Sequence, residues 1–395
     1  MTVRIPALVE PRLLEWARKC LNMSLEQAAL KISVKPEKLE SWERGTPPPS
    51  ISQLRKLANV YKIPIATFYM DKPPRGYSIM RDFRRVAETG KVPFSSELIL
   101  EVQNAHYHRE NALELYELLN HNVPTLARRI KMTQEIESTA SLIRNMLGIS
   151  RNAQVNLQSN YEAFRFWKNA LEKNGILVFQ SLNVSIDEMR GFSIGLMPLP
   201  CVVVNVHDWV LARIFTVIHE LVHILLHIDG ICDLFDESEN EEKKLIEQFC
   251  NYVAGAVLVP AEYLLLENQV HYYKIGERWS DEDIEGLADK YKVSREVLVR
   301  RLLICGRVTQ DFYQEKREQY MREPHRERSG GWPSPATDAI RELGEPYIRL
   351  IYSAYNNGLI TLSDMSDFLG VRTKHFNSIE REVFKRWDTA STQAG

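Results

Sequence analysis

The chain has 395 residues, which at roughly 150 residues per domain predicts two or three domains. It contains 50 lysines and arginines against 52 aspartates and glutamates, so a wholly basic nucleic-acid coat and an acidic disordered tail are both excluded. Apolar residues make up 44% of the sequence, which is enough to form buried cores.

Three features favour a cytoplasmic protein with no membrane partner. The longest apolar runs, such as residues 199–206, are far shorter than the ~18 residues that a membrane helix needs. The first ten residues contain no apolar stretch typical of a secretory signal. The cysteines are odd in number and form no CxxC pair, which favours reduced thiols over disulfides or a zinc ribbon. They are Cys20, Cys201, Cys232, Cys250 and Cys305.

Charge is unevenly distributed along the chain. Residues 1–76 carry 13 lysines and arginines against 7 aspartates and glutamates, a net charge of +6, so the remainder carries −8. A basic first module on an acidic body indicates an N-terminal segment that contacts phosphate.

Residues 10–69 predict four or five short helices. Ser24 and Gln27 form a capping-box pattern at the start of one helix. A turn at residues 33–35 follows, and Pro36 opens a second helix that Gly45 ends. Two helices joined by a short turn are typical of the helix-turn-helix, whose second helix enters the DNA major groove.

The motifs LEQAA, SWERG and PSISQLRKLANVYKIPIATFY resemble the XRE family of DNA-binding domains. The resemblance implies that DNA is a partner through residues 24–45. It also implies the contact residues, which are Lys35, Lys38, Ser41 and Arg44. The alternative is a helical bundle used only for dimerisation or docking. Three glutamates on the presumed recognition helix, Glu37, Glu40 and Glu43, repel phosphate and offer few base contacts beyond cytosine.

Proline- and glycine-rich stretches at residues 71–76 and 327–335 divide the rest of the chain. Residues 95–175 have helical periodicity. Three short strands are expected next, at residues 176–182, 191–196 and 201–206, and the last has the apolar character of a central strand. Short strands inside a mainly helical chain indicate an α+β middle domain.

The motif HELVH at residues 219–223 predicts a metal site. His219 and His223 are four residues apart on an apolar helix, so both imidazoles project from one side and suit a tetrahedral Zn²⁺. Glu220 lies beside the metal, where it would take a proton from water as the general base. The alternative, two histidines that face solvent, fits an apolar helix poorly. The buried face is expected at Phe215, Ile218, Val222, Leu225 and Leu226.

A catalytic zinc normally takes three protein ligands. Glu247 is the favoured third ligand, because it opens a second apolar helical run at residues 247–260. Glu241 and Glu242 remain alternatives. Asn251 is a candidate partner for a ligating histidine, and His227 is expected at the rim of the site.

Residues 190–260 resemble the ImmA/IrrE family of zinc metallopeptidases, through CVVVN, RIFTVIHELVHILLH and EQFCNYVAGAVLVP. The resemblance implies that His219, His223 and Glu247 bind zinc and that Glu220 is the catalytic base. Many members carry an N-terminal XRE domain. The family usually has Gly where Val222 stands, so we expect looser packing against the strand edge where a peptide would lie.

The expected fold class is mainly α, with a five-helix helix-turn-helix bundle, a small α+β zincin-like metallopeptidase domain and a helical C-terminal extension. The expected boundaries are 1–72, a linker at 73–91, 92–326 and 327–395. The family resemblance implies a regulatory endopeptidase that cleaves a transcriptional repressor or a toxin-like or antitoxin-like partner. The rival hypothesis is a DNA-binding antitoxin or transcription regulator whose peptidase-like domain is a binding platform.

Residues 280–320 have a helix-turn-helix sequence pattern, with Ser294 as a candidate N-cap. A packing role is favoured there over a substrate or nucleic-acid contact. Residues 336–386 predict two or three more helices, which we interpret as a partner-binding surface.

Overall fold

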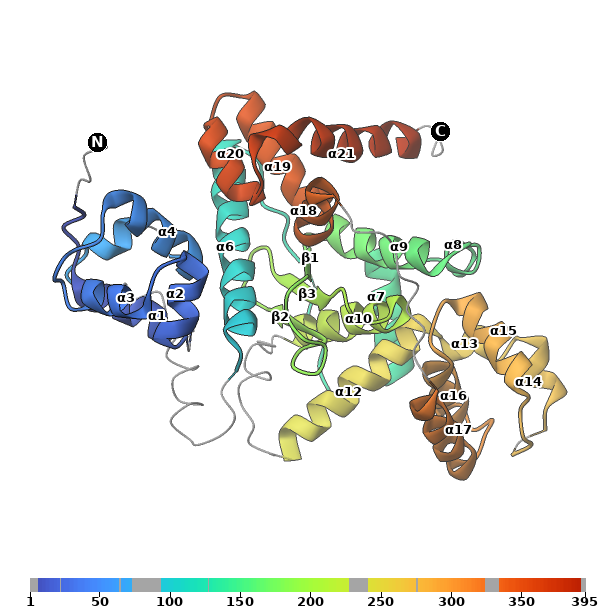
Figure 1. The fold of residues 1–395 in the computed structure, drawn as a ribbon. Coiled ribbons are helices and arrows are strands. Elements are labelled where there is room, and N and C mark those ends of the chain that lie inside the picture. The colour runs from blue at the N-terminus through green and yellow to red at the C-terminus, as the bar shows by residue number, and fades with distance from the viewer. Residues whose placement is uncertain are drawn as a thin grey trace. The chain divides into compact units, whose positions relative to one another are not determined.

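The computed structural model describes residues 6–21, 23–63, 65–72, 94–126, 128–226, 241–274, 276–323 and 334–391. The predicted linker at 73–91, His227 and Cys232 lie outside these residues. The chain divides into two compact units, Met1–Tyr107 and His108–Gly395 (Figure 1). Within the described residues, helices predominate and three strands form one small sheet, which confirms the predicted fold class.

The first unit contains the predicted helix-turn-helix bundle, with a 3₁₀ helix as its fifth member. Its elements are α1 (Pro11–Cys20), α2 (Leu25–Ile32), α3 (Pro36–Glu43), α4 (Ile51–Tyr61), η1 (Ile65–Tyr69) and the first half of α6 (Ser96–Leu118). Ser24 caps α2 in a complete capping box with Gln27, as the sequence predicts. The α2–α3 turn begins at Ser33 in the left-handed conformation.

One buried ion pair ties α1 to α3. Arg18 donates hydrogen bonds from Nε and Nη2 to the two carboxylate oxygens of Glu43, at 2.7 and 2.8 Å. The Arg18 and Glu43 side chains are 10% and 7% exposed. Arg18 also donates to the carbonyl of Met23, at 2.9 Å, so one guanidinium holds three segments of the bundle together.

The second unit consists of a three-stranded sheet surrounded by helices. Its first helices, after the second half of α6, are α7 (Ile136–Leu147), α8 (Arg151–Val155) and α9 (Asn160–Lys173). After the sheet come α10 (Val210–Leu226), α12 (Glu241–Leu258), α13 (Ala261–Leu264), α14 (Asn268–Tyr272), α15 (Asp281–Tyr291), α16 (Arg295–Ile304) and α17 (Gln310–Arg322). The last are α18 (Pro335–Leu343), α19 (Glu345–Asn356), α20 (Leu362–Leu369), η2 (Thr373–His375) and α21 (Phe376–Ser391).

The sheet has the strand order β1-β3-β2, with strands β1 (Leu177–Ser181), β2 (Gly191–Ile194) and β3 (Cys201–Asn205). Strand β3 is central, as its apolar sequence predicts, and pairs in parallel with β1 and antiparallel with β2. Gly191 lies opposite Val204 and Ser193 opposite Val202. The three predicted strands are therefore confirmed.

The core forms where α10 packs against α9, α12 and the strands β2 and β3. Three carbonyls at the C-terminal end of α12 are held by buried side chains. Arg144 donates to the carbonyl of Val257 at 2.7 Å, and Gln154 to that of Leu258 at 2.8 Å. Arg301 of α16 donates to the carbonyl of Val259 at 2.9 Å. Guanidinium groups satisfy a helix C-terminus well because its carbonyls carry partial negative charge.

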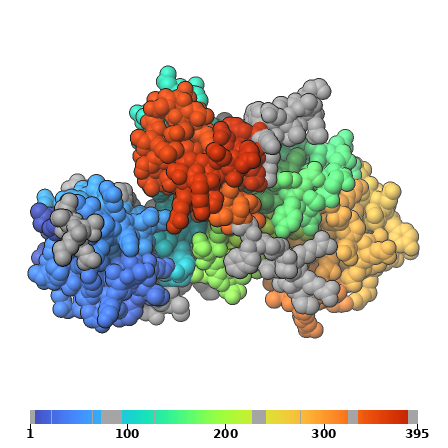
Figure 2. All heavy atoms as spheres, turned by 45° about the horizontal axis from the view of Figure 1, so that its top comes forward, coloured from blue at the N-terminus to red at the C-terminus, as the bar shows by residue number. Residues whose placement is uncertain are grey.

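Residues 334–391 form four α-helices, more than the two or three expected. The extra break comes at Gly344, which ends α18 and directly begins α19. Helix α18 packs against β1, where Gln180 donates to the carbonyl of Arg341 at 2.8 Å. Figure 2 shows these helices as one red block beside the green helices α8 and α9.

None of the helices in the described residues combines the length and the apolar character that a membrane span requires.

Candidate functional site

The HELVH segment lies in the second half of α10, a helix in which most residues are buried. Ile218, Val222 and Leu225 are fully buried, as predicted. Phe215 and Leu226 are instead partly exposed. Phe215 is partly exposed because it lies on the side of the helix that faces the pocket. Its ring stacks on that of His219, with ring centroids 6.2 Å apart.

Three predicted residues converge on one point. The Nε2 atoms of His219 and His223 are 3.0 Å apart. Glu247 of α12 places one carboxylate oxygen 3.2 Å from His219 Nε2 and the other 3.0 Å from His223 Nε2. The three residues form a group with ligand atoms within 4.8 Å of one another. The alternatives Glu241 and Glu242 are exposed in the first turn of α12 and are not part of this group.

This donor set fits a tetrahedral metal ion. Two ligands about 2.1 Å from one tetrahedral Zn²⁺ lie about 3.4 Å apart, close to the separations of 3.0 to 3.2 Å seen here. Two imidazole nitrogens at 3.0 Å repel each other unless a cation or a proton lies between them. The arrangement therefore favours a bound cation.

The pKa shifts of His223 and Glu247, two of the three candidate ligands, agree with this geometry. Burial by itself lowers the pKa of His223, but hydrogen bonds to Cys250 and Glu247 raise it to about 11. Burial raises the pKa of Glu247, whereas hydrogen bonds from His219 and His223 lower it well below its usual range. Both net shifts mean that positive charge is favoured at the point where the ligands meet.

Glu220 points to the neighbouring strand. Its Oε2 accepts a hydrogen bond from Ser193 Oγ of β2 at 2.7 Å, and both residues are buried. The sequence does not predict Ser193, because a serine 27 residues before Glu220 carries no signal of its own. Asn251, the candidate partner for a ligating histidine, also lines the site. In the described part of the chain His219 Nδ1 has no hydrogen-bond partner, so Asn251 does not support that ring.

A pocket of about 390 Å³ opens over His219, Glu220 and Glu247. Its walls come from Arg190 and the start of β2, from α10, from α12 and from α16. Helix α16 contributes Ser294, Glu296, Val297 and Arg300. Ser294 caps α16 as predicted, and Leu298, Val299 and Leu302 of the same helix pack in the core. Helix α16 therefore has the predicted packing role and also forms one wall of the pocket.

Val222 does not face the strand. It lies about 200° around the helix from Glu220 and is fully buried in the core. The close approach of α10 to β2 falls at Thr216, which lies over Gly191. The expected loosening at the strand edge is therefore not seen, because the valine faces another direction.

The residues predicted to contact DNA lie on or directly beside α3. Lys35, Lys38 and Arg44 are exposed, and Ser41 is half-buried and donates to the carbonyl of Lys38 at 2.7 Å. Arg44 pairs with Glu40 one turn earlier on the helix. Glu43, expected to repel phosphate, is instead neutralised inside the bundle by Arg18.

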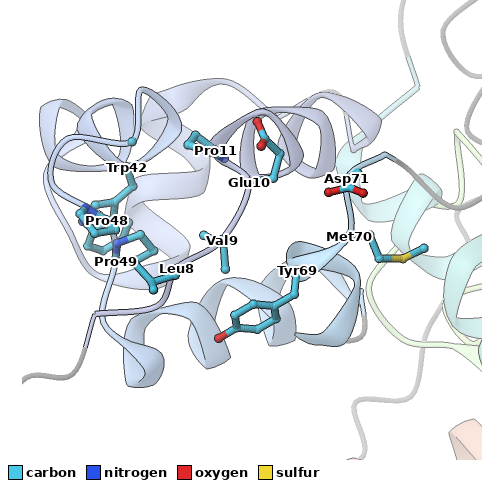
Figure 3. A pocket seen from close by; sticks show the side chains of 11 residues that line it. Leu8, Val9, Glu10, Pro11, Trp42, Pro48, Pro49, Tyr69, Met70 and Asp71 are labelled. Carbon is cyan, nitrogen blue, oxygen red and sulfur yellow. The ribbon is translucent and has the colours of Figure 1, made fainter.

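A second pocket, of about 380 Å³, lies in the first unit and is lined mostly by apolar residues. Trp42, Pro48 and Pro49 lie at one end of it and Tyr69 and Met70 at the other (Figure 3). The four predicted DNA-contact residues are not among its lining residues, so this pocket is separate from the exposed face of α3.

A helix with HExxH that faces a glutamate on a second helix, beside a small sheet, defines a metallopeptidase-like domain. Residues 171–303 match the M78 peptidase family, described as the IrrE N-terminal-like domain, and residues 14–68 match the helix-turn-helix family. The chain thus carries an IrrE N-terminal-like domain preceded by a helix-turn-helix domain of XRE type, as the sequence motifs predicted. No curated protein matches the chain.

Proposed function

We propose that the protein is a regulatory zinc endopeptidase with a DNA-binding helix-turn-helix. In this proposal His219, His223 and Glu247 hold zinc. The observation that carries it is the convergence of these ligands, from two helices, beside Glu220 in a single pocket. Zinc, when bound, would supply Lewis acidity that polarises a peptide carbonyl and makes water a better acid.

Glu220 performs the proton transfers. Ser193 occupies its Oε2, which leaves Oε1 to accept a proton from the attacking water and to donate it to the leaving amine. The pocket, walled by α10, α12 and α16, holds the peptide near this carboxylate.

The first unit supplies the contact with DNA. Lys35, Lys38, Ser41 and Arg44, on or directly beside α3 and within residues 24–45, contact it. The proposed location is the cytoplasm. The helix-turn-helix family supports DNA binding. We assign residues 1–72 to the helix-turn-helix, 73–91 to a linker, 92–326 to the peptidase domain and 327–395 to the extension.

A repressor or a toxin-like partner protein is the substrate in this proposal, and cleavage regulates transcription. The alternative is a DNA-binding antitoxin or transcription regulator whose metallopeptidase-like domain only binds partners. It is favoured by the helices at residues 334–391, which add surface without contributing a lining residue to the pocket.

Glu220→Gln separates the two functions, because it keeps shape and hydrogen bonding but removes the proton acceptor. The zinc content of the variant should stay unchanged. Hydrolysis of the protein encoded by the adjacent gene should fall roughly 10²–10⁴-fold, and the regulatory output in cells should be lost. Glu242→Gln, outside the pocket, is the control. Full output from Glu220→Gln would leave the binding platform as the function.

A further inference from the structure

Strand β2 and helix α10 contact each other at two successive points along their lengths. A Cβ atom built on Gly191 would lie 2.4 Å from Thr216 Cγ2 and 2.8 Å from the carbonyl oxygen of Val203. The helix therefore approaches the strand closely only because residue 191 has no side chain.

The next contact follows two residues along the strand and one turn along the helix. Ser193, on the same face of β2 as Gly191, meets Glu220, which is four residues after Thr216. A step of two strand residues is about 6.8 Å, and a step of four helix residues is about 6 Å. The two pairs thus match in spacing, and the close approach at Gly191 delivers the Ser193 hydroxyl to the Glu220 carboxylate.

We propose that Ser193 is a positioning residue for Glu220, acting through the 2.7 Å hydrogen bond from Oγ to Oε2. This inference rests on the proposed function of Glu220 as general base. Glu220 lines the pocket and is 8% exposed, whereas Ser193 is fully buried and is not among the lining residues, so the hydroxyl holds the carboxylate from its buried side.

The reason for such a residue is the freedom of glutamate. Its side chain has several rotatable bonds, and a carboxylate at a pocket wall would otherwise divide its time among rotamers. A strand hydroxyl fixes one oxygen and so fixes where the other oxygen points. A base that is held in the reactive geometry acts on the chemical step, and misplacement by about 1 Å costs up to about 100-fold in rate.

The test uses the full chain loaded with zinc and a library of quenched fluorescent peptides. Ser193→Ala should lower kcat about 10- to 100-fold and leave KM unchanged, since the base acts only in the chemical step. Ser193→Thr keeps the hydroxyl and should restore most of the rate. Ser181→Ala, at an equally buried serine on β1, is the matched control and should turn over as wild type does.

A double variant identifies the route of the effect. If Ser193 works through Glu220, adding Ser193→Ala to Glu220→Gln should cause no further loss of rate. Equal, additive losses in both backgrounds would overturn the proposal, as would a wild-type rate for Ser193→Ala.

A crystal structure of Ser193→Ala tests the same proposal without any substrate. The Glu220 carboxylate should leave its wild-type rotamer or show several conformers, with the zinc content unchanged. A single wild-type rotamer would overturn the inference even if no peptide were cleaved. Absence of turnover by the wild-type protein, in contrast, would count against the proposed function and not against the positioning of Glu220.

Discussion

Glu43 accepts two hydrogen bonds from Arg18 inside the helix-turn-helix bundle, and the two side chains are almost completely buried. Glu40, one turn earlier on the same helix, pairs with Arg44 in solvent. One short helix therefore carries two glutamates in ion pairs, one buried and one exposed to solvent.

The first prediction compares these two pairs. Glu43→Ala leaves a buried arginine without its carboxylate and should destabilise the bundle by about 3–5 kcal/mol. Glu40→Ala removes an exposed pair and should cost at most about 1 kcal/mol. Hydrogen exchange of peptides from residues 11–61 in the full chain measures both. Similar loss of protection in the two variants would contradict the burial argument.

The second prediction concerns metal content. The wild-type protein should bind one zinc per chain, and His223→Ala and Glu247→Ala should lose most of it, because each removes one of the three proposed ligands. Glu241→Ala should retain zinc. Metal analysis after dialysis measures this directly, and full zinc in Glu247→Ala would transfer the third ligand to another residue.

The third prediction concerns DNA. Lys35→Ala and Lys38→Ala should each weaken binding of the full chain to duplex DNA and reduce the log–log salt slope by about 1. Lys56→Ala, at another exposed lysine, on α4, provides a charge-matched control. Titrations at several salt concentrations give the slopes. If all three variants behave alike, only the total charge matters and α3 is not the contact helix.

The fourth prediction concerns the strand–helix approach. Gly191→Ala forces a methyl group against Thr216 and the backbone of Val203, so the free energy of unfolding should fall by about 1–3 kcal/mol. Gly286→Ala, in an exposed turn of α15 with open space around it, should raise it by about 0.5–1 kcal/mol. Urea unfolding of both variants measures the difference. Equal effects would show that close approach at Gly191 is not the constraint.

Patterns with a fixed period made most of the second unit predictable. The apolar run of β3 marks a central strand, and the i, i+4 spacing of His219 and His223 places both rings on one side of α10. The position of Glu247 at the start of a second apolar helical run favours it as the third ligand, and the structure brings it to the two histidines.

Contacts that depend on the register between distant elements were not predictable. Ser193 contacts Glu220 only because a step of two residues along β2 matches one turn of α10. Helix α16 lines the pocket although it lies more than 70 residues after Glu220 in the chain. The inward orientation of Glu43 did have a signal. It lies four residues after Leu39, which is buried, and so on the same face of α3.

Strand β1 is an outer strand of the sheet, yet all five of its residues are buried. Helix α18 packs against it, and at Gly344 the chain passes over the ion pair of Lys168 and Glu172 on α9. A chain cut before residue 334 would therefore uncover an apolar outer strand, the kind of surface that recruits other copies into aggregates. The C-terminal helices thus act as a shield for one side of the peptidase-like domain, and their removal should reduce solubility before it affects any chemistry.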